Sequence, residues 1–197
     1  MGPGQGRIGL LGGTFDPPHE GHLWMAERAR RELILAKVLL LPAYHPPHKD
    51  PAEISPYPLR LEMLRLLCAG RRHLRIDEAE RESGGAGYTV DLVRFLQARE
   101  PDRRFVLIIG EDSLAEIETW KDPDALFALI EVAVLARAGV RTASRRPCIL
   151  LAGETHPAQS RLIRQAIAAG AKPRWLPPAL AAFIAEKGLY RRAEDRA

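Results

Sequence analysis

The chain has 197 residues, of which 46% are hydrophobic and 27% are charged, and its formal net charge is +4 at pH 7. A chain of this length builds one sizeable core, so we expect a single domain over residues 1–197, with a C-terminal helical portion at about 157–192. No apolar run reaches the roughly 20 residues that cross a bilayer, and the N-terminus lacks the apolar core of a secretory signal. These features exclude a transmembrane protein and favour a cytoplasmic enzyme or binding protein.

The basic excess is mild, and much of it lies in arginine pairs scattered along the chain. That pattern is typical of a solvated surface rather than of a nucleic-acid-binding stripe, and it also suits an anionic small substrate. Cys68 and Cys148 lie in apolar segments and are interpreted as buried thiols, not as a disulfide or a zinc site. We therefore expect no nucleic-acid partner, no membrane partner and no metal site made by the protein alone.

Short, mostly continuous apolar runs recur from one end of the chain to the other. Runs of this length and continuity are typical of strands buried on both faces, as in a parallel sheet. They predict six strands, at residues 7–11, 37–42, 73–78, 104–110, 132–137 and 148–152.

Helical periodicity separates several of these strands. The segments "EGHLWMAERARREL", "PLRLEMLRLL" and "YTVDLVRFLQ" place apolar residues three or four positions apart, on one face of a helix. Strands that alternate with helices predict βαβ units and an α/β fold with a doubly wound, mostly parallel sheet.

The loop that follows the first strand, within "LLGGTFDPPHEGH" (10–22), combines glycines, prolines and two histidines. Ligands of open α/β sheets bind at the carboxyl ends of the strands, where this loop lies. Gly12 and Gly13 allow close approach of a ligand and a positive φ, and Gly21 and His22 open a helix whose N-terminus favours negative charge. His19 and His22 fall about one turn apart, so the loop predicts a phosphate site.

Two other interpretations of the histidines remain open. They are candidates for metal ligands, but Asp16 and Glu20 give no recognisable spacing for a third ligand. They are also candidates for incidental residues of a surface loop, which the neighbouring glycines and prolines argue against. The sequence contains neither the ATPase phosphate loop nor the dinucleotide-binding glycine pattern, so phosphate binding by the histidines is the favoured hypothesis.

"GGTFDPPHEGH" resembles the signature of the H-x-G-H nucleotidyltransferases, and the whole chain is similar to bacterial nicotinate-nucleotide adenylyltransferases. The likeness extends over nearly the whole chain, through the segments "PPHK" (46–49), "GYT" (87–89), "IIGEDSLAEIETW" (108–120), "ARAG" (136–139) and "KGLYR" (187–191). It implies a Rossmann-like nucleotidyltransferase fold. It also implies transfer of AMP from ATP to nicotinate mononucleotide, a step of NAD biosynthesis that releases pyrophosphate.

The resemblance also implies the residues that bind ATP. His19 and His22 would hold oxygens of the α- and β-phosphates, an imidazolium there would stabilise the leaving pyrophosphate, and Lys49 and Arg164 would add cations. The full ATP-binding set is Gly12, Gly13, Thr14, Phe15, His19, His22, Gly110, Asp112, Ser160, Ile163 and Arg164. In "AQSRLIR" (158–164), Arg161 stands where the family carries a threonine, which exchanges a hydroxyl for a cation.

The acceptor needs a flat surface for its pyridine ring and donors for its carboxylate. Trp120, in the polar segment "ETWKDP", offers the surface, and Tyr88 and Thr89, at a helix start, offer the donors. Asp112 is a candidate for a ribose or base contact, or alternatively for a helix N-cap. The substrate-binding set is His48, Lys49, Tyr88, Thr89, Trp120 and Arg137, whereas Trp24 and Trp175 are interpreted as packing residues.

The implied reaction needs no general base, because the attacking phosphate oxygen is already charged. The protein has to align the reactants and neutralise charge, and Mg²⁺ is expected with ATP. Three alternatives remain: nicotinamide mononucleotide as acceptor, another phosphorylated acceptor, and a nucleotide-binding homologue without catalysis. The partners are expected to be small molecules, with a homo-oligomer as a further option.

Overall fold

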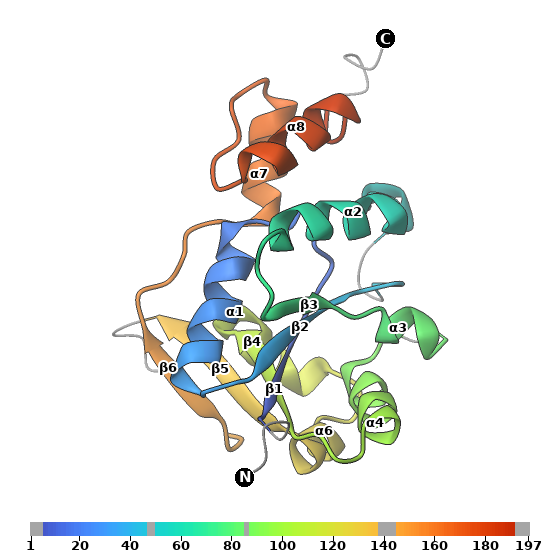
Figure 1. Ribbon diagram of the computed structural model, residues 1–197, viewed down its shortest axis with the longest axis vertical. Coiled ribbons are helices and arrows are strands. Elements are labelled where there is room, and N and C mark those ends of the chain that lie inside the picture. The colour runs from blue at the N-terminus through green and yellow to red at the C-terminus, as the bar shows by residue number, and fades with distance from the viewer. Residues whose placement is uncertain (1–5, 47–49, 85–86, 138–144, 192–197) are drawn as a thin grey trace.

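The computed structural model describes residues 6–46, 50–84, 87–137 and 145–191, and within them six strands form one parallel sheet in the order β3-β2-β1-β4-β5-β6 (Figure 1). The strands are β1 (Ile8–Gly13), β2 (Lys37–Pro42), β3 (Leu74–Ile76), β4 (Phe105–Gly110), β5 (Glu131–Arg137) and β6 (Ile149–Gly153). All six predicted strands are confirmed, with ends that differ from the prediction by two residues or fewer.

Helices cover both faces of this sheet. The three helices predicted from periodicity are α1 (Glu20–Glu32), α2 (Tyr57–Cys68) and α4 (Thr89–Arg99). Shorter elements follow the strands or complete the connections: η1 (Pro51–Glu53), α3 (Ala79–Glu82), α5 (Glu111–Ala115), η2 (Ile117–Thr119) and α6 (Pro123–Leu129). The C-terminal region contributes α7 (Ser160–Ala168) and α8 (Pro178–Glu186). The predicted doubly wound α/β fold is thereby confirmed.

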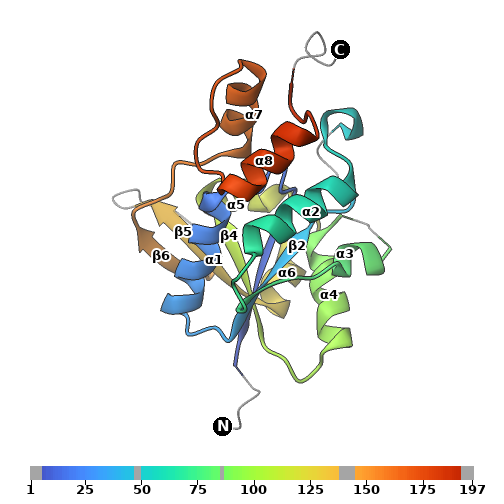
Figure 2. The same cartoon turned by 45° about the horizontal axis from the view of Figure 1, so that its top comes forward.

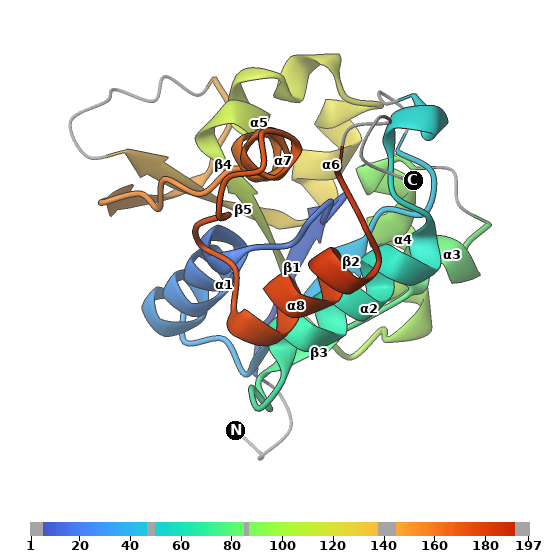
Figure 3. The ribbon, with the colours of Figure 1, turned by 90° about the horizontal axis from the view of Figure 1, so that it is seen from above.

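The core consists of two apolar clusters, one on each face of the sheet. Successive strand residues alternate between them, as the pleat requires: Leu40 of β2 packs with α1, α2 and α8, whereas Leu39 and Leu41 pack with α4 and α6. Figures 2 and 3 both show α8 lying along α2, on the same face as α1. The sheet is thus enclosed on both faces, which explains the continuous apolar runs of its strands.

The strand order reverses at β1, which pairs with β2 on one side and with β4 on the other. β1 ends at Gly13 and β4 at Gly110, so their carboxyl ends open to the same edge of the sheet. Such a switch point is where open α/β sheets bind ligands. Among the described residues, no helix combines the length and the apolar character needed to span a membrane.

Candidate active site

The loop between β1 and α1 turns sharply at Phe15. The left-handed φ of 52° lies at Phe15, and neither Gly12 nor Gly13 has a positive φ, so the expectation of a positive φ at these glycines is wrong. These glycines matter because they leave space. Nothing lies within 4 Å of a Cβ built at Gly12, so a ligand can approach the backbone there. A Cβ built at Gly13 would lie 3.2 Å from the buried Phe15 ring. The Phe15 ring also packs edge-on against His22, with the ring centroids 4.9 Å apart. Phe15 therefore packs against the loop and against the ring of His22.

Gly21 makes room for the first histidine. His19 is the N-cap residue of α1, with an extended backbone, and only 6% of its surface is exposed. A Cβ at Gly21 would lie 2.9 Å from Nδ1 of His19, closer than side-chain carbons approach other atoms. The glycine of this short motif is thus needed for the position of the ring at the helix start.

The two imidazoles stack on one another, with centroids 3.8 Å apart and planes 28° apart. The backbone N–H of His19 donates to Nδ1 of His22 at 3.1 Å. In a neutral His22 ring the proton therefore sits on Nε2, which is a hydrogen-bond donor. Nδ1 of His19 is buried and finds no hydrogen-bond partner in the described part of the chain. Nδ1 faces the start of α1, where the His19 side chain and the backbone of His22 are arranged as in a capping box.

The surroundings of both histidines favour the neutral ring. Burial, and secondarily the neighbouring His156, lowers the pKa of His19 from 6.5 to about 4. Burial, and secondarily His19, lowers the pKa of His22 well below 6.5. Removal from water disfavours the charged ring, whereas an arriving polyanion would raise both pKa values. The imidazolium expected beside the leaving pyrophosphate therefore stays a prediction for the nucleotide-bound protein.

Two cavities meet at the histidines. The first, which we call the sheet-edge cavity, has a volume of about 430 Å³ and is lined, among others, by Gly12, Gly13, Thr14, His22, Met25, Glu80, Thr89, Gly110, Asp112, Ser113 and Trp120. The second, the α1 cavity, has about 460 Å³ and is lined by His19, Gly21, His22, Trp24, Met25, Gly110, Glu111, Asp112, Leu135, Thr155, His156, Pro157, Ala158 and Gln159. The residues common to both are His22, Met25, Gly110 and Asp112.

The structure therefore brings together most of the residues predicted for the site. Asp112 is exposed and lies in the first turn of α5, whose N-cap is Gly110, so the alternative that Asp112 caps this helix is wrong. Thr89 and Trp120 line the sheet-edge cavity as predicted. Tyr88 does not: it is 40% exposed and its ring lies 4.8 Å from Nζ of Lys121.

The predicted residues of α7 face the loop that carries the histidines. The hydroxyl of Ser160 donates to the Pro17 carbonyl at 2.9 Å, and Nη1 of Arg164 donates to the Asp16 carbonyl at 2.6 Å. Ile163 is 1% exposed and its N–H donates to the carbonyl of Gln159, so its side chain has no surface left for ATP. These residues attach α7 to the loop. Their predicted contact with nucleotide stays a prediction for Ser160 and for the remaining donors of Arg164.

Three predicted substrate residues have side chains that the structure does not place. His48 and Lys49 lie outside the described residues, and Arg137 ends β5 at the same sheet edge with only its backbone described. Arg161 is described: it is exposed on α7 and lines neither cavity. The exchange of threonine for arginine at this position therefore leaves the walls of both cavities unchanged. Trp24 packs on the core as predicted, and it also lines the α1 cavity.

Two residues of the cavity walls had no sequence-based prediction. Glu80 is buried in the sheet-edge cavity, where its Oε1 accepts from the N–H of Tyr44 (2.8 Å) and His45 (3.4 Å), and burial raises its pKa. His156 accepts from the N–H of Ala158 at 3.2 Å and lines the α1 cavity beside His19. The sequence offered a signal for His156, because it is a histidine in a loop directly after a predicted strand. No sequence pattern indicated Glu80.

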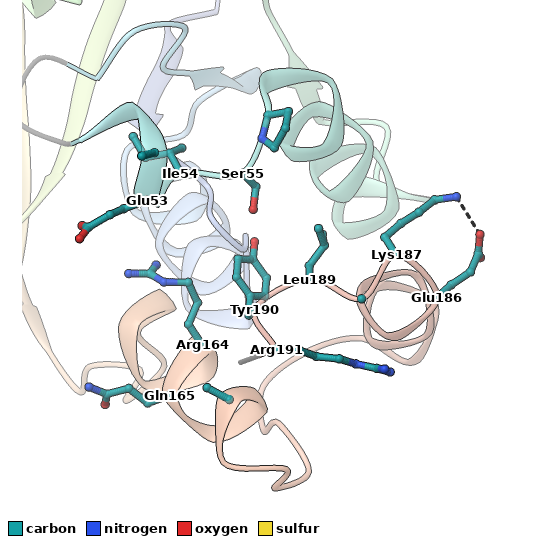
Figure 4. Close-up of a pocket in the computed structure, with 14 residues that line it drawn as sticks. Glu53, Ile54, Ser55, Arg164, Gln165, Glu186, Lys187, Leu189, Tyr190 and Arg191 are labelled. Atoms are coloured by element: carbon teal, nitrogen blue, oxygen red, sulfur yellow. Dashed lines mark hydrogen bonds and ion pairs between the residues drawn. The ribbon is translucent and has the colours of Figure 1, made fainter. Parts of the chain in front are cut away.

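A larger cavity, of about 1110 Å³, lies elsewhere among the described residues. It is a groove between the segment 52–56, α7 and the end of the chain after α8, which we call the C-terminal groove (Figure 4). It contains neither histidine of the pair, nor Gly110 or Asp112. Size alone therefore does not locate the chemistry of this protein.

The described residues contain no cluster of three or more histidine, cysteine, aspartate or glutamate side chains able to hold a metal ion. Mg²⁺, however, usually binds through one or two carboxylates together with the phosphates of its substrate. Asp112, which is exposed to both cavities, fits that mode of binding. The donor set thus suits a metal that arrives with a nucleotide.

The switch-point sheet and the histidine loop define a nucleotidyltransferase, and residues 10–166 match the family described as cytidylyltransferase-like. Relatives named as probable nicotinate-nucleotide adenylyltransferases include one in Lactiplantibacillus plantarum, 37% identical over 93% of this chain and 88% of the relative. Another, in Halalkalibacterium halodurans, is 39% identical over 96% of this chain and 94% of its own length. The chain belongs to the family of nicotinate-nucleotide adenylyltransferases.

Solved structures confirm the fold. The nicotinic acid mononucleotide adenylyltransferase of Plasmodium falciparum, complexed with NaAD, superposes with a TM-score of 0.80 over 94% of this chain and 98% of its own. A Vibrio parahaemolyticus structure described as a nicotinate-nucleotide adenylyltransferase gives a TM-score of 0.73 over 95% of this chain and 97% of that one. The sequence identities are 15% and 18%, so these likenesses support the architecture alone.

Proposed function

We propose that this protein transfers the adenylyl group of ATP to nicotinate mononucleotide, giving deamido-NAD and pyrophosphate in NAD biosynthesis. The observation that carries the proposal is the stacked pair of His19 and His22, at the N-terminus of α1, where two cavities share a wall. Two substrates in adjoining cavities can meet at that wall. Membership in the nicotinate-nucleotide adenylyltransferase family supports the same reaction.

The α1 cavity suits ATP. The 13-residue helix α1 directs the positive end of its dipole toward the start of this cavity. The Nε2–H of His22 adds a hydrogen-bond donor for phosphate oxygens, and the His19 ring lies beside it in the same wall. Thr155 and His156, in the loop after β6, extend this wall.

The sheet-edge cavity suits the mononucleotide. Thr89 begins α4, a helix of 11 residues, so the N-terminus of α4 offers backbone N–H groups to the acceptor carboxylate. Trp120 supplies a ring in the same wall, against which a pyridine ring can stack. The volume of about 430 Å³ lies within the usual range for a small-ligand site, roughly 300–1,000 Å³.

The chemistry is an in-line displacement. An oxygen of the acceptor phosphate forms a bond to the α-phosphorus of ATP, the bond from that phosphorus to the bridging oxygen breaks, and pyrophosphate leaves with the bonding electrons. No proton has to be removed from the attacking oxygen, so the residues act by alignment and charge stabilisation. As negative charge gathers on the phosphates, the pKa values of His19 and His22 rise, and their N–H bonds donate more strongly.

Mg²⁺ is proposed to enter with ATP, where it neutralises part of the phosphate charge. Asp112 is the carboxylate we propose to hold it, since Asp112 lines both cavities. Contacts of His48, Lys49 and Arg137 with substrate stay predictions, as do a homo-oligomeric state and a cytoplasmic location.

A product assay tests the reaction. Purified protein with ATP and Mg²⁺ is offered nicotinate mononucleotide, nicotinamide mononucleotide and phosphopantetheine in parallel, and products are separated by chromatography. Deamido-NAD as the dominant product is expected. A preference for nicotinamide mononucleotide would mean that the amide, and not the acid, is the acceptor. ATP binding without any product would indicate a nucleotide-binding homologue that does not catalyse.

The same assay tests the histidine pair. His22→Ala is expected to lower kcat ~100-fold or more, the usual effect of removing one hydrogen-bond donor to the reacting phosphates. His73→Ala is the matched control, because His73 pairs with Glu27 at 2.6 Å and lines neither cavity. Similar activity of the two variants would contradict a role of His22 at the phosphates.

A further inference from the structure

The histidine loop contacts two residues that line the C-terminal groove, Ser55 and Tyr190. Asp16, three residues before His19, is 3% exposed and makes both contacts through its carboxylate. Oδ1 accepts from the hydroxyl of Tyr190 at 2.5 Å, and Oδ2 accepts from the backbone N–H of Ser55 at 3.2 Å. Figure 4 shows the Ser55 side chain and the Tyr190 hydroxyl pointing toward one another in the groove.

Tyr190 reaches this place from the far end of the chain. The helix α8 ends at Glu186, Gly188 turns the backbone at a φ of 58°, and Tyr190 itself has a φ of 64°. An aromatic residue rarely adopts the left-handed region, and strained conformations of this kind persist where surrounding contacts fix them. The hydroxyl contacts the carboxylate of Asp16, the side chain of Ser55 and, more weakly, the sulfur of Met63 at 3.7 Å.

The surroundings of the Tyr190 hydroxyl favour its protonated form. Burial, followed by the charge of Asp16 and the hydrogen bond to it, raises the pKa of Tyr190 far above its ordinary value. The hydroxyl is therefore available as a donor to Asp16. This hydrogen bond joins two segments that are 174 positions apart in the sequence.

Two side chains of α7 donate to backbone carbonyls of the loop. Arg164 donates to the carbonyl of Asp16, and Ser160 donates to the carbonyl of Pro17. Tyr190 instead donates to the side-chain carboxylate of Asp16. The histidine loop is thus attached by three separate side chains. Of these, only Tyr190 acts through a loop side chain rather than through the backbone.

We propose that Tyr190 is a positioning residue for adenylyl transfer: by holding the carboxylate of Asp16, it fixes the loop so that His19 and His22 face the phosphates. The inference rests on the proposed function of this loop. Asp16 and His19 are separated only by two prolines, which transmit the position of one to the other because their φ angles are fixed. Loss of the contact between Tyr190 and Asp16 shifts His19 and His22. The shift lowers the rate mainly because these side chains have to be aligned with the phosphates in the transition state.

Tyr190→Phe removes only the hydroxyl. We expect kcat to fall ~10-fold, since small displacements of aligned groups cost rate even when made from a distance. KM for ATP should change much less, because the walls of the α1 cavity remain. Tyr57→Phe is the matched control: Tyr57 also donates to a carboxylate, Glu78, at 3.3 Å, but touches neither the histidine loop nor the two cavities.

Asp16→Ala tests the route, because it removes the oxygen that accepts from Tyr190, whereas an asparagine would keep an acceptor there. If Tyr190 acts through Asp16, the double variant Asp16→Ala with Tyr190→Phe is no slower than Asp16→Ala alone. Multiplication of the two single effects would overturn the route. Asp16→Asn keeps the side-chain volume but turns the acceptor for Ser55 N–H into a donor, so it serves as the second variant if another fails to fold.

A readout that does not depend on turnover separates this inference from the proposed function. The ring ¹⁵N resonances of His19 and His22 should shift in Tyr190→Phe and stay in place in Tyr57→Phe. Shifted resonances in a protein whose wild type makes no deamido-NAD would support the positioning role and overturn the function. Unchanged kcat and unchanged resonances, with only a lower melting temperature, would overturn the positioning role.

Discussion

His19 lies at the N-cap of α1 with 6% of its surface exposed, and its ring stacks on that of His22. In the unfolded chain the same ring is solvated and takes up a proton below a pH of about 6.5. In the folded chain, burial and the nearby His156 lower the pKa to about 4. The histidine that we propose for phosphate binding is thus held in its neutral form, which lowers the stability of the protein in acid.

The stability of the protein should therefore depend on pH through His19. Between about pH 6.5 and about pH 4 the unfolded state binds more protons than the folded state, so the free energy of unfolding falls as the pH falls. His19 contributes roughly 3 kcal/mol to this loss over the whole interval, at about 1.4 kcal/mol per pKa unit. His19→Asn, whose amide does not titrate but still suits an N-cap, should show a flatter profile.

Urea unfolding of the wild type and of His19→Asn across this pH range measures the difference. The two curves should run parallel above the pH at which the unfolded histidine titrates and separate below it. Parallel curves throughout would mean that His19 keeps its ordinary pKa in the fold. The pH at which they separate reports the unfolded pKa and not the folded one.

At the scale of the element, α2 is attached to the site by one buried arginine. Arg60 is 2% exposed, and its guanidinium donates to the carbonyls of Ser55 (3.0 Å), Thr14 (2.8 Å) and Ala43 (2.8 Å). These carbonyls belong to the approach to α2, the histidine loop and the end of β2. A single side chain thus joins the approach to α2 to two segments that line the sheet-edge cavity, at Thr14 and Ala43.

Arg60→Met should destabilise the protein by about 3 kcal/mol, because it keeps the buried stem but leaves carbonyl oxygens without donors. Arg65→Met, on the same helix, is the matched control: Arg65 is exposed and pairs only with Glu62 at 3.1 Å. Its expected effect is within ~0.5 kcal/mol. Urea midpoints of the two variants provide the comparison, and equal midpoints would show that water replaces the guanidinium without cost.

Sequence patterns predicted the elements with enough turns or enough apolar length to carry a period. The six strands and the helices α1, α2 and α4 were found in this way. The helices α3, α5 and α6 were not, since they have only 4, 5 and 7 residues. Arg60 shows a signal that was available: with Met63, Leu64 and Leu67 it follows the helical spacing of the buried stripe, and a charged residue in that stripe indicates a buried partner.

Some residues of the candidate site were likewise predicted from the sequence, and others were not. Gly110 and Asp112 were predicted from the family resemblance, and Asp112 also from its position just after a strand, where open α/β sheets bind ligands. Glu80 and Tyr190 were not, because each reaches its place through tertiary packing that no local pattern records. Protonation state was also beyond the sequence, since it depends on how deeply His19 and His22 are buried.

At the scale of the whole molecule, the C-terminal helices complete the core rather than form a separate unit. Leu180 and Ile184 of α8 are 0% and 3% exposed, in the same apolar cluster as Leu11 of β1 and Met63 of α2. The chain end after α8 then carries Tyr190 to the histidine loop. The single domain predicted over residues 1–197 requires that these helices unfold together with the sheet.

Leu180→Ala tests this requirement. It should lower the free energy of unfolding by about 2–5 kcal/mol, through lost burial and the cavity left behind. The loss should appear as one cooperative transition, with far-ultraviolet circular dichroism and tryptophan fluorescence changing together. Leu162→Ala on α7 is the matched control, since Leu162 is 38% exposed, and its effect should stay small. An early transition in which α8 detaches while the sheet stays folded would contradict a single domain, and it would leave the histidine loop without Tyr190.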